Sequence, residues 1–400
     1  MLILLSIFHC AFNPDEPVGL KDNEKYKLQL YPAGVFPNGG TGLPANYITE
    51  LSVYGSSMWI STFGGGAARM DTVENLTLYS GTTSAYGVSI VAGSQGAVYL
   101  ANNGGNYVQD FISTSGTVTT NSGGIGNLSN PYLHGVFNGS NFYVLNDGRN
   151  NRYLEANSTD VTTIYIEGNG GNAASTSNLI RRTYSNGDYC MLAEALTDIA
   201  ADRENDLIAI GYFWTDGTKS PTSCPTGSYE PAALYMAIYR ISASDLTQNK
   251  NKGTEIRPIQ VGFSGEIPTA IYYDDRSVGS FIDEFVYVAS SSALYEVELR
   301  NWNSIFDVKR FTKSDGLPST NIRAILTTVG PDLRGTEPIR RIWAATDRGL
   351  AVFIDTWETL DINNSDMPSN NVTDLAYFAG NIWAATDAGL VKVIPQQQEQ

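Results

Sequence analysis

Histidine is the side chain best suited to proton transfer near neutral pH, and this 400-residue chain has only two. His9 lies in an apolar leader, which leaves His134, in NPYLHGVFNG, as the one histidine candidate for a general base. A histidine at the start of a strand is more often simply hydrogen-bonded. The GxSxG, HExxH and phosphate-loop patterns do not occur in the sequence. We therefore predict no catalytic residues.

Acidic side chains gather in three places: Asp198 with Asp202, Asp274 with Asp275, and the segment DINNSD at residues 361–366. In the last segment Asp361, Asn363 and Ser365 alternate as the oxygen ligands of a calcium loop do. However, the segment lacks the glycine and the distal glutamate of an EF-hand, and it suits a turn between repeats. We predict no cofactor or metal, with calcium at this segment as the alternative.

The chain is strongly acidic, with 25 basic and 41 acidic residues and a formal charge of −16. Such a surface repels phosphate backbones, and no basic stripe offsets it. Nucleic acids and anionic membrane surfaces are therefore not expected as partners, and a protein partner or a glycan is expected instead. Contact with a membrane is expected only through a lipid anchor at the N-terminus.

The first dozen residues, MLILLSIFHCAF, are apolar, and the chain then turns polar. The run is shorter than the roughly 20 residues that cross a bilayer as a helix. It is typical of the apolar core of an export signal, although a positive segment is missing. Cys10 stands where a lipoprotein carries its lipid, although His9 fits that pattern poorly. We predict an extracytoplasmic protein, secreted, periplasmic or membrane-anchored; lipidation of Cys10, a cleaved leader and an ordinary buried strand remain alternatives.

The other two cysteines, Cys190 and Cys224, are flanked by polar loop residues, and their spacing fits no zinc pattern. In an exported protein such a pair is expected to form a disulfide. A bridge that closes a loop of this length stabilises a fold by about 3–4 kcal/mol.

A repeated segment of the sequence indicates which strands and turns carry the candidate residues. IWAATDRGLAVF at residues 342–353 returns as IWAATDAGLVKV at residues 382–393, and residues 42–70 hold a third copy, GLPANYITELSVYGSSMWISTFGGGAARM. In each copy a Leu-Pro or Met-Pro turn precedes a short strand. A second strand opens with tryptophan, and a glycine six residues later leads to a third. A fourth strand follows the middle copy, and four antiparallel strands in about forty residues are typical of a propeller blade.

Weaker copies start near residues 86, 130, 196 and 267. The whole sequence therefore predicts an all-β, seven-bladed β-propeller of four-stranded antiparallel blades, with six or eight blades as alternatives. The last copy stops after its third strand, so we predict that the strand in residues 25–34 completes the last blade and closes the ring. The expected layout is a leader or anchor and linker at 1–24, one propeller at 25–395 and a disordered tail at 396–400.

The pattern GLPxNx[IV]…WxxTxxGL resembles the two-component-regulator propeller repeat in three of the seven expected blades. That family includes periplasmic sensor regions of hybrid histidine kinases, and streptogramin lyases are related seven-bladed propellers. The resemblance implies an exported β-propeller and suggests recognition of a ligand or a protein, without transferring an activity. Streptogramin-lyase-like chemistry resembles a histidine-dependent elimination, and the single candidate, His134, argues against it.

In propellers, the loops between blades and those between second and third strands normally open on one face around the central channel. We predict that amide, carboxylate and guanidinium groups on this face bind a ligand. The predicted residues are Asn46, Asn321 and Asn371 between blades, Asp347, Arg348 and Asp387 in the second set of loops, and Asn102, Asn103, Asp147 and Arg149 in weaker blades. The alternative is that these side chains cap their own turns. Trp59, Trp343 and Trp383 are expected in the core between blades.

These observations predict an exported, non-catalytic propeller that serves as a ligand-recognition or protein-interaction scaffold, with a glycan as one candidate ligand. One alternative is a carbohydrate-active or lyase-type propeller enzyme that uses acidic residues of the channel face. The other is a structural subunit of a surface assembly. Conserved carboxylates on the channel face would favour the enzyme, and exposed apolar blade edges would favour assembly.

Overall fold

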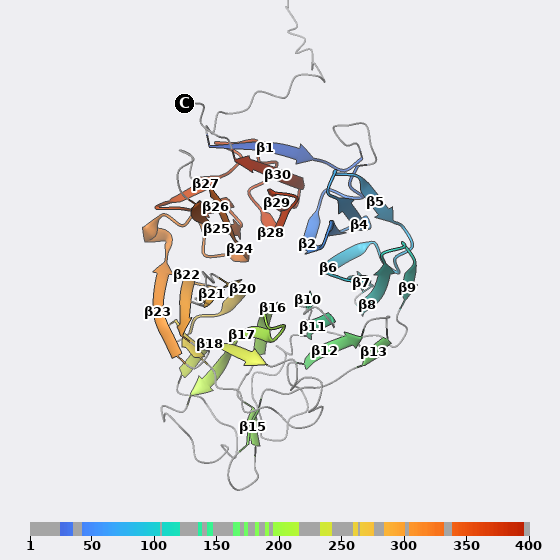
Figure 1. The fold of residues 1–400 in the computed structure, drawn as a ribbon. Helices are drawn as coiled ribbons and strands as arrows, with labels where there is room; N and C mark the ends of the chain where they lie inside the picture. The colour runs from blue at the N-terminus through green and yellow to red at the C-terminus, as the bar shows by residue number, and fades with distance from the viewer. Residues whose placement is uncertain are drawn as a thin grey trace, which may run out of the picture.

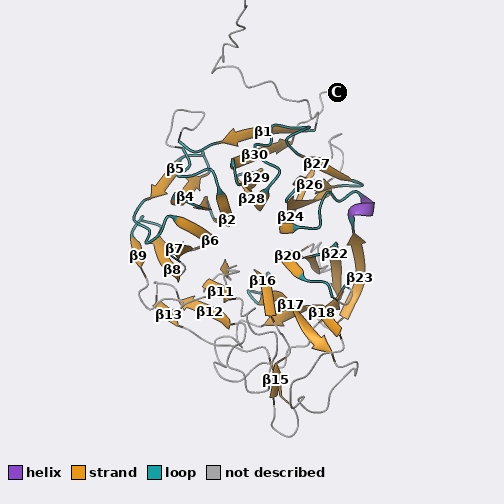
Figure 2. Cartoon of the chain, turned by 180° about the vertical axis from the view of Figure 1, so that it is seen from behind, coloured by secondary structure: helices purple, strands orange, loops and turns teal. Residues whose placement is uncertain are grey.

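The computed structural model of the chain is almost entirely β-strand (Figure 1). The residues it describes are 25–34, 42–104, 106–120, 135–137, 142–146, 163–168, 172–174, 181–183, 189–191, 195–215, 233–241, 259–262, 265–275, 284–300, 304–331 and 338–395. Their strands form seven four-stranded antiparallel sheets around a central axis, and one two-stranded sheet (Figure 2). The predicted all-β propeller is therefore confirmed. The number of blades in the whole chain stays a prediction, because these sheets are counted over the described residues alone.

The four-stranded sheets are numbered here as blades in chain order, and in each the first strand of the blade lies nearest the axis (Figure 1). The first blade comprises β2 (Ile48–Tyr54), β3 (Ser57–Thr62), β4 (Gly66–Asp71) and β5 (Leu76–Tyr79). The second comprises β6 (Tyr86–Gly93), β7 (Gly96–Asn103), β8 (Asn106–Ser113) and β9 (Val118–Thr120). The third comprises β10 (Gly135–Phe137), β11 (Phe142–Asn146), β12 (Thr163–Gly168) and β13 (Asn172–Ala174). The two-stranded sheet follows, with β14 (Arg181–Thr183) and β15 (Tyr189–Met191).

The remaining four blades complete the ring. The fourth blade comprises β16 (Ala195–Ala201), β17 (Leu207–Thr215), β18 (Ala233–Ile241) and β19 (Ile259–Val261). The fifth comprises β20 (Pro268–Asp275), β21 (Glu284–Ser290), β22 (Leu294–Arg300) and β23 (Ser304–Phe311). A 3-10 turn, η1 (Lys313–Asp315), leads to the sixth blade, with β24 (Ile322–Pro331), β25 (Pro338–Thr346), β26 (Gly349–Phe353) and β27 (Trp357–Leu360). The seventh comprises β28 (Val372–Phe378), β29 (Asn381–Thr386), β30 (Gly389–Pro395) and β1 (Tyr26–Tyr31).

The N-terminal strand closes the ring, as predicted. β1 is antiparallel to β30, with Tyr26 opposite Pro395 and Tyr31 opposite Leu390, so that the two ends of the described propeller share one blade. Without β1 the outer edge of β30 would expose a row of unpaired N–H and C=O groups. This pairing removes that edge.

Three tryptophans hold neighbouring blades together, which confirms their predicted place in the core. Trp59, Trp343 and Trp383 are each at most 2% exposed. Trp343 of the sixth blade packs in one cluster with seventh-blade residues such as Leu375. Trp383 of the seventh blade does the same with Ile60 of the first. One blade thus buries its apolar face on the next around the ring.

Six of the innermost strands share an irregularity that positions the channel side chains. In the first blade Ile48 pairs with Thr62 and Glu50 with Ser61, so Thr49 is one extra residue. The same β-bulge occurs in β6, β16, β20, β24 and β28. We call the residue after each extra residue the post-bulge residue: Glu50, Ser89, Asp198, Ala270, Ala324 and Asp374. A bulge bends a strand and re-aims its side chains.

Several predictions from the sequence fall on residues outside the described ranges. These are the leader with Cys10, the tail, His134, Asp147, Arg149 and Cys224; Cys190 lies in β15, so its disulfide with Cys224 is untested. Over the part of the chain that is described, no helix has the length and apolar character needed to cross a membrane.

Candidate active site in the central channel

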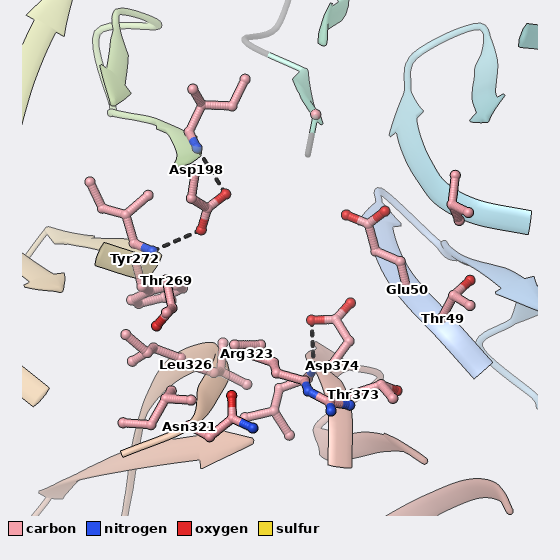
Figure 3. A pocket seen from close by; sticks show the side chains of 18 of the residues that line it. Thr49, Glu50, Asp198, Thr269, Tyr272, Asn321, Arg323, Leu326, Thr373 and Asp374 are labelled. Atoms are coloured by element: carbon pink, nitrogen blue, oxygen red, sulfur yellow. Dashed lines mark hydrogen bonds between the residues drawn. The ribbon is translucent and has the colours of Figure 1, made fainter. Parts of the chain in front are cut away.

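A cavity of about 850 Å³ lies at the axis of the ring, where the innermost strands meet (Figure 3). All seven blades contribute to its lining, the third through Gly135 alone among the described residues. Its size falls within the range of roughly 300–1,000 Å³ that small-molecule sites occupy. Its polar lining residues include Thr49, Glu50, Asp198, Thr269, Asn321, Arg323, Thr373 and Asp374.

Three of these residues are carboxylates in equivalent positions: Glu50, Asp198 and Asp374 are all post-bulge residues. They were not predicted as site residues. The signal that could have found them is a recurring tetrad, apolar–Thr–acid–apolar, which reads ITEL at 48–51, LTDI at 196–199 and VTDL at 372–375. Aligning the weaker blades on this tetrad, instead of on tryptophan and glycine, brings the three acids into register.

The two aspartates are held by backbone N–H groups. Asp374 Oδ1 accepts from Leu375 N at 2.7 Å, and Oδ2 accepts from Leu51 N of the first blade at 2.6 Å. Asp198 repeats this arrangement, with Ile199 N and Ile271 N of the fifth blade each at 2.8 Å from its oxygens. Both carboxylates are therefore held in place by two N–H donors each.

Glu50 is in a different electrostatic situation. One oxygen, Oε2, accepts from Ile90 N of the second blade at 2.8 Å. Burial raises the pKa of the Glu50 carboxyl well above its usual range, and the negative charges of Asp374 and Asp198 raise it further. A carboxyl group whose pKa is raised binds its proton more tightly than an ordinary glutamate does, as a general acid–base group in an active site often must.

Arg323 supplies positive charge in the same cavity. It is the extra residue of the β24 bulge, where Thr49 and Thr373 stand in the first and seventh blades. No carboxylate of the described residues lies within ion-pair distance of its guanidinium group, which leaves that charge available to a ligand. Nearby, the buried hydroxyl of Thr269 has no hydrogen-bond partner within the described part of the chain.

Two predicted pairs of ligand-binding residues come together at one mouth of the channel. Asn321 Nδ2 donates to Asp347 Oδ2 at 3.3 Å, and Asn371 Nδ2 donates to Asp387 Oδ2 at 2.9 Å. These pairs are equivalent in the sixth and seventh blades. Burial opposes ionisation of Asp347, but hydrogen bonds from Ser319 and Asn321 outweigh it and lower the pKa of that carboxyl. Arg348, beside Asp347, adds a nearby positive charge.

The remaining predicted residues have other places. Asn46 is not equivalent to Asn321 and Asn371; its Oδ1 accepts from Ala33 N at 2.6 Å, just as Asn370 Oδ1 accepts from Ile362 N. It therefore ties the outer strand of one blade to the start of the next. Asn102 and Asn103 end β7, and Asn102 lies opposite Tyr86.

The segment at residues 361–366, the alternative calcium site, forms a turn. Asp361 Oδ1 accepts from Asn363 N at 2.7 Å, and Ser365 Oγ donates to the Asp361 carbonyl at 2.6 Å. Within the described residues, no group of three or more His, Cys, Asp or Glu side chains is arranged to hold a metal ion. The carboxylate serves the turn between the sixth and seventh blades.

No protein-family model matches the sequence, and no curated protein matches it either. Similar solved structures include a streptogramin B lyase, with 11% identity and a TM-score of 0.55 over 93% of this chain and 99% of the other. The virginiamycin B lyase from Staphylococcus aureus has 13% identity and a TM-score of 0.53, over 92% and 99%. A gluconolactonase from Xanthomonas campestris has 11% identity and a TM-score of 0.43, over 92% and 98%. At these identities the likeness is one of fold.

These comparisons correct the functional prediction made from the sequence. A non-catalytic recognition or scaffold module was expected, but two solved propellers with this fold are lyases. The carboxylates found in the cavity lie on the channel face, where the alternative prediction placed the acidic residues of an enzyme. The physical reason for the error is that the channel acids form no local motif and come together only when the ring closes.

Proposed function

We propose that the chain is a propeller enzyme of the lyase type, with its active site in the central cavity. The observation that carries the proposal is that Glu50, a half-buried carboxyl with a raised pKa, lines the same cavity as Arg323, a cation without an acidic partner among the described residues. An elimination next to a carbonyl group requires an acid–base group and a positive charge that face the same substrate. That solved neighbours are lyases also supports it.

The ionised Glu50 removes a proton from the carbon beside a substrate carbonyl, and the electron pair forms an enolate whose oxygen faces Arg323. The enolate collapses, a carbon–carbon double bond forms, and the bond to the leaving oxygen or nitrogen breaks. The protonated Glu50 then returns its proton to the leaving atom, so that atoms and charges balance. Asp198 and Asp374 raise the proton affinity of Glu50 without moving, because their oxygens are already bound.

The base in this proposal is a carboxylate instead of a histidine. The described lining of the cavity contains no histidine, which agrees with the scarcity of that residue in the sequence. We further propose that the blades are of the two-component-regulator propeller type, on the strength of the GLPxNx[IV]…WxxTxxGL repeat, and that the enzyme works outside the cytoplasm, as the apolar leader suggests.

The test is a spectrophotometric assay for the conjugated double bond that elimination creates. The full chain would be incubated with polyuronates, their methyl esters and streptogramin B, and the rise in ultraviolet absorbance followed. We expect turnover with one substrate class, and a loss in kcat of about 10²–10⁴-fold in Glu50→Gln. Arg323→Met is expected to lose about 10²–10³-fold, the usual cost of removing a group that stabilises an oxyanion.

A matched control is Glu358→Gln, which makes the same change in a half-buried residue of β27 outside the cavity. Its kcat should equal that of the unchanged chain. Equal turnover by the unchanged chain and Glu50→Gln would refute the assigned role, and an absence of elimination across the substrate set would refute the lyase proposal.

A further inference from the structure

Three exposed aromatic side chains touch one another at one mouth of the channel. Tyr47, Phe63 and Tyr86 are 39%, 46% and 51% exposed. The ring centroids of Tyr47 and Phe63 lie 5.8 Å apart, and those of Phe63 and Tyr86 lie 5.0 Å apart. We call these three residues the aromatic rim. Contiguous exposed apolar side chains of this kind mark binding surfaces more often than scattered ones do.

The aromatic rim opens directly onto the cavity and is firmly held. Tyr47 and Phe63 both line the cavity that contains Glu50 and Arg323. Phe63 N donates to Tyr47 O at 2.8 Å, and Phe63 also forms a backbone bridge with Tyr86 of the next blade. Aromatic side chains on fixed backbone offer a large contact area at low entropic cost.

Strand register places these aromatic residues in the positions that Asn–Asp pairs occupy elsewhere. Tyr47 precedes Ile48 as Asn371 precedes Val372, and Phe63 follows Thr62 as Asp387 follows Thr386. The seventh blade adjoins the first, since Thr373 Oγ1 donates to Ile48 O at 2.7 Å. One mouth of the channel therefore presents an apolar sector beside a sector of amides and carboxylates.

This combination matches a sugar ring. A pyranose has an apolar face of C–H groups, which packs on an aromatic ring, and a periphery of hydroxyls, which hydrogen-bond to amides and carboxylates. Elimination additionally requires a carbonyl beside an acidic C–H, and among sugars the uronates carry one. With a chain charge of −16, a neutral methyl ester approaches the channel with less repulsion than a free uronate.

We infer that the aromatic rim is the sugar-binding subsite of the active site, and that the substrate is a glycan of esterified uronates. This inference rests on the proposed lyase function for its choice of uronates. One sugar ring packs on Phe63 between Tyr47 and Tyr86, its hydroxyls reach Asn371 and Asp387, and the next sugar along the chain enters the cavity.

The test measures binding separately from turnover. Isothermal titration of full-length Glu50→Gln with methyl-esterified galacturonan oligosaccharides should show binding, with weaker binding of the de-esterified oligomers. Adding Phe63→Ala or Tyr86→Ala should raise Kd by about tenfold or more, which corresponds to roughly 1.4 kcal/mol. The control, Tyr377→Ala, removes an equally exposed aromatic at the far end of β28 and should leave Kd unchanged. Thermal melting of each variant checks that it folds.

The outcomes separate the two proposals. Absence of binding by both oligomers, or an unchanged Kd in both rim variants, overturns the subsite. Tighter binding of the de-esterified oligomers overturns the preference for the ester. Loss of binding in the rim variants together with full turnover by the Glu50→Gln chain leaves the subsite in place and overturns the catalytic role of Glu50.

Discussion

Asp374 in the seventh blade accepts a hydrogen bond from Leu51 N in the first blade, at 2.6 Å from Oδ2. The ring is therefore closed twice, by the β1–β30 pairing at its outer edge and by this carboxylate at the channel. All three acidic post-bulge residues of the described strands share this arrangement: each accepts from the N–H of the residue that follows the post-bulge position in the next blade. Glu50 does so with Ile90, and Asp198 with Ile271.

Removing such a carboxylate should weaken the ring. Asp374→Ala leaves the N–H groups of Leu51 and Leu375 without their acceptor, and an unsatisfied buried donor costs about 1–3 kcal/mol. We expect the free energy of unfolding in urea to fall by that amount. Asp366→Ala, in the turn that precedes β28, is the control and should change it by no more than about 0.5 kcal/mol. Equal losses in the two variants would contradict a specific role for Asp374.

The raised pKa of Glu50 makes a prediction about pH. Because the folded state binds this proton more tightly than the unfolded chain, whose Glu pKa is about 4.3, the contribution of Glu50 to stability is greatest at acid pH. It declines as pH rises from that value through the folded-state pKa. Glu50→Gln, which cannot ionise, should therefore gain stability relative to the unchanged chain as pH rises from 4 to 8.

Thermal melting of the two proteins across that pH range is the measurement. The difference in melting temperature should move steadily in favour of Glu50→Gln with rising pH. A difference that stays constant would show that Glu50 has the same pKa folded and unfolded, and the general acid–base proposal would lose its electrostatic support.

A second charged group ties the first blade to the last. The Glu74 carboxylate, in the β4–β5 turn, accepts from the Tyr31 hydroxyl and pairs with Lys392 of β30. Glu74 has a φ of 68°, an uncommon angle for a residue with a side chain. Burial raises the pKa of Glu74, but hydrogen bonds from Lys392 and Tyr31 outweigh burial, and the net result is a lowered pKa. Glu74 therefore stabilises the fold at pH values above its unfolded-state pKa, and this stabilisation is lost as pH falls through its folded-state pKa.

Lys392→Met should therefore destabilise the protein by about 1–3 kcal/mol at neutral pH, since a carboxylate is left partly buried without its cation. The loss should shrink at pH 3. Lys25→Met provides the comparison, because it breaks an ion pair with Glu358 that is more than a third exposed and contributes about 0–1 kcal/mol. Urea unfolding at both pH values measures the free energy of unfolding of each variant. If Lys392→Met loses no more of it than Lys25→Met does, the Glu74–Lys392 pair does not stabilise the contact between the first and last blades.

The sequence predicted the parts of the fold that depend on strong local patterns. The repeated IWAATD segments, the tryptophan core and closure by residues 25–34 all follow from apolar periodicity and turn residues, which act over a few positions. The channel acids each follow a bulge in an innermost strand, and no turn residue marks a bulge. Glu50 and Asp374 become neighbours only through ring closure, across more than 300 residues of sequence.

Loop length explains the errors in register. Tyr47, not Asn46, occupies the place of Asn321 and Asn371, because the strands that follow begin at Ile48, Ile322 and Val372. Likewise Gly66, not Gly65, pairs with Thr62 as Gly349 pairs with Thr346, since the turn of the first blade is one residue longer. Spacing from tryptophan cannot reveal such an insertion.

Gly349 is expected to tolerate no side chain. Its φ is 118°, in the region that favours glycine, and a Cβ there would lie 2.5 Å from the Leu360 carbonyl oxygen. That oxygen belongs to the backbone of the neighbouring strand and cannot rotate away. Gly349→Ala should therefore reduce the free energy of unfolding by about 3 kcal/mol or more, the sum of backbone strain and a displaced strand.

The variant Gly380→Ala separates the cost of backbone strain from the cost of displacing the neighbouring strand. Gly380 also has a positive φ, 79°, but nothing lies within 4 Å of its would-be Cβ, so only backbone strain of about 1–2 kcal/mol is expected. Urea unfolding should give a clearly lower free energy of unfolding for Gly349→Ala than for Gly380→Ala. If the two lose equal stability, the contact with Leu360 contributes nothing, and the repeated glycine after each tryptophan is required for its backbone angle alone.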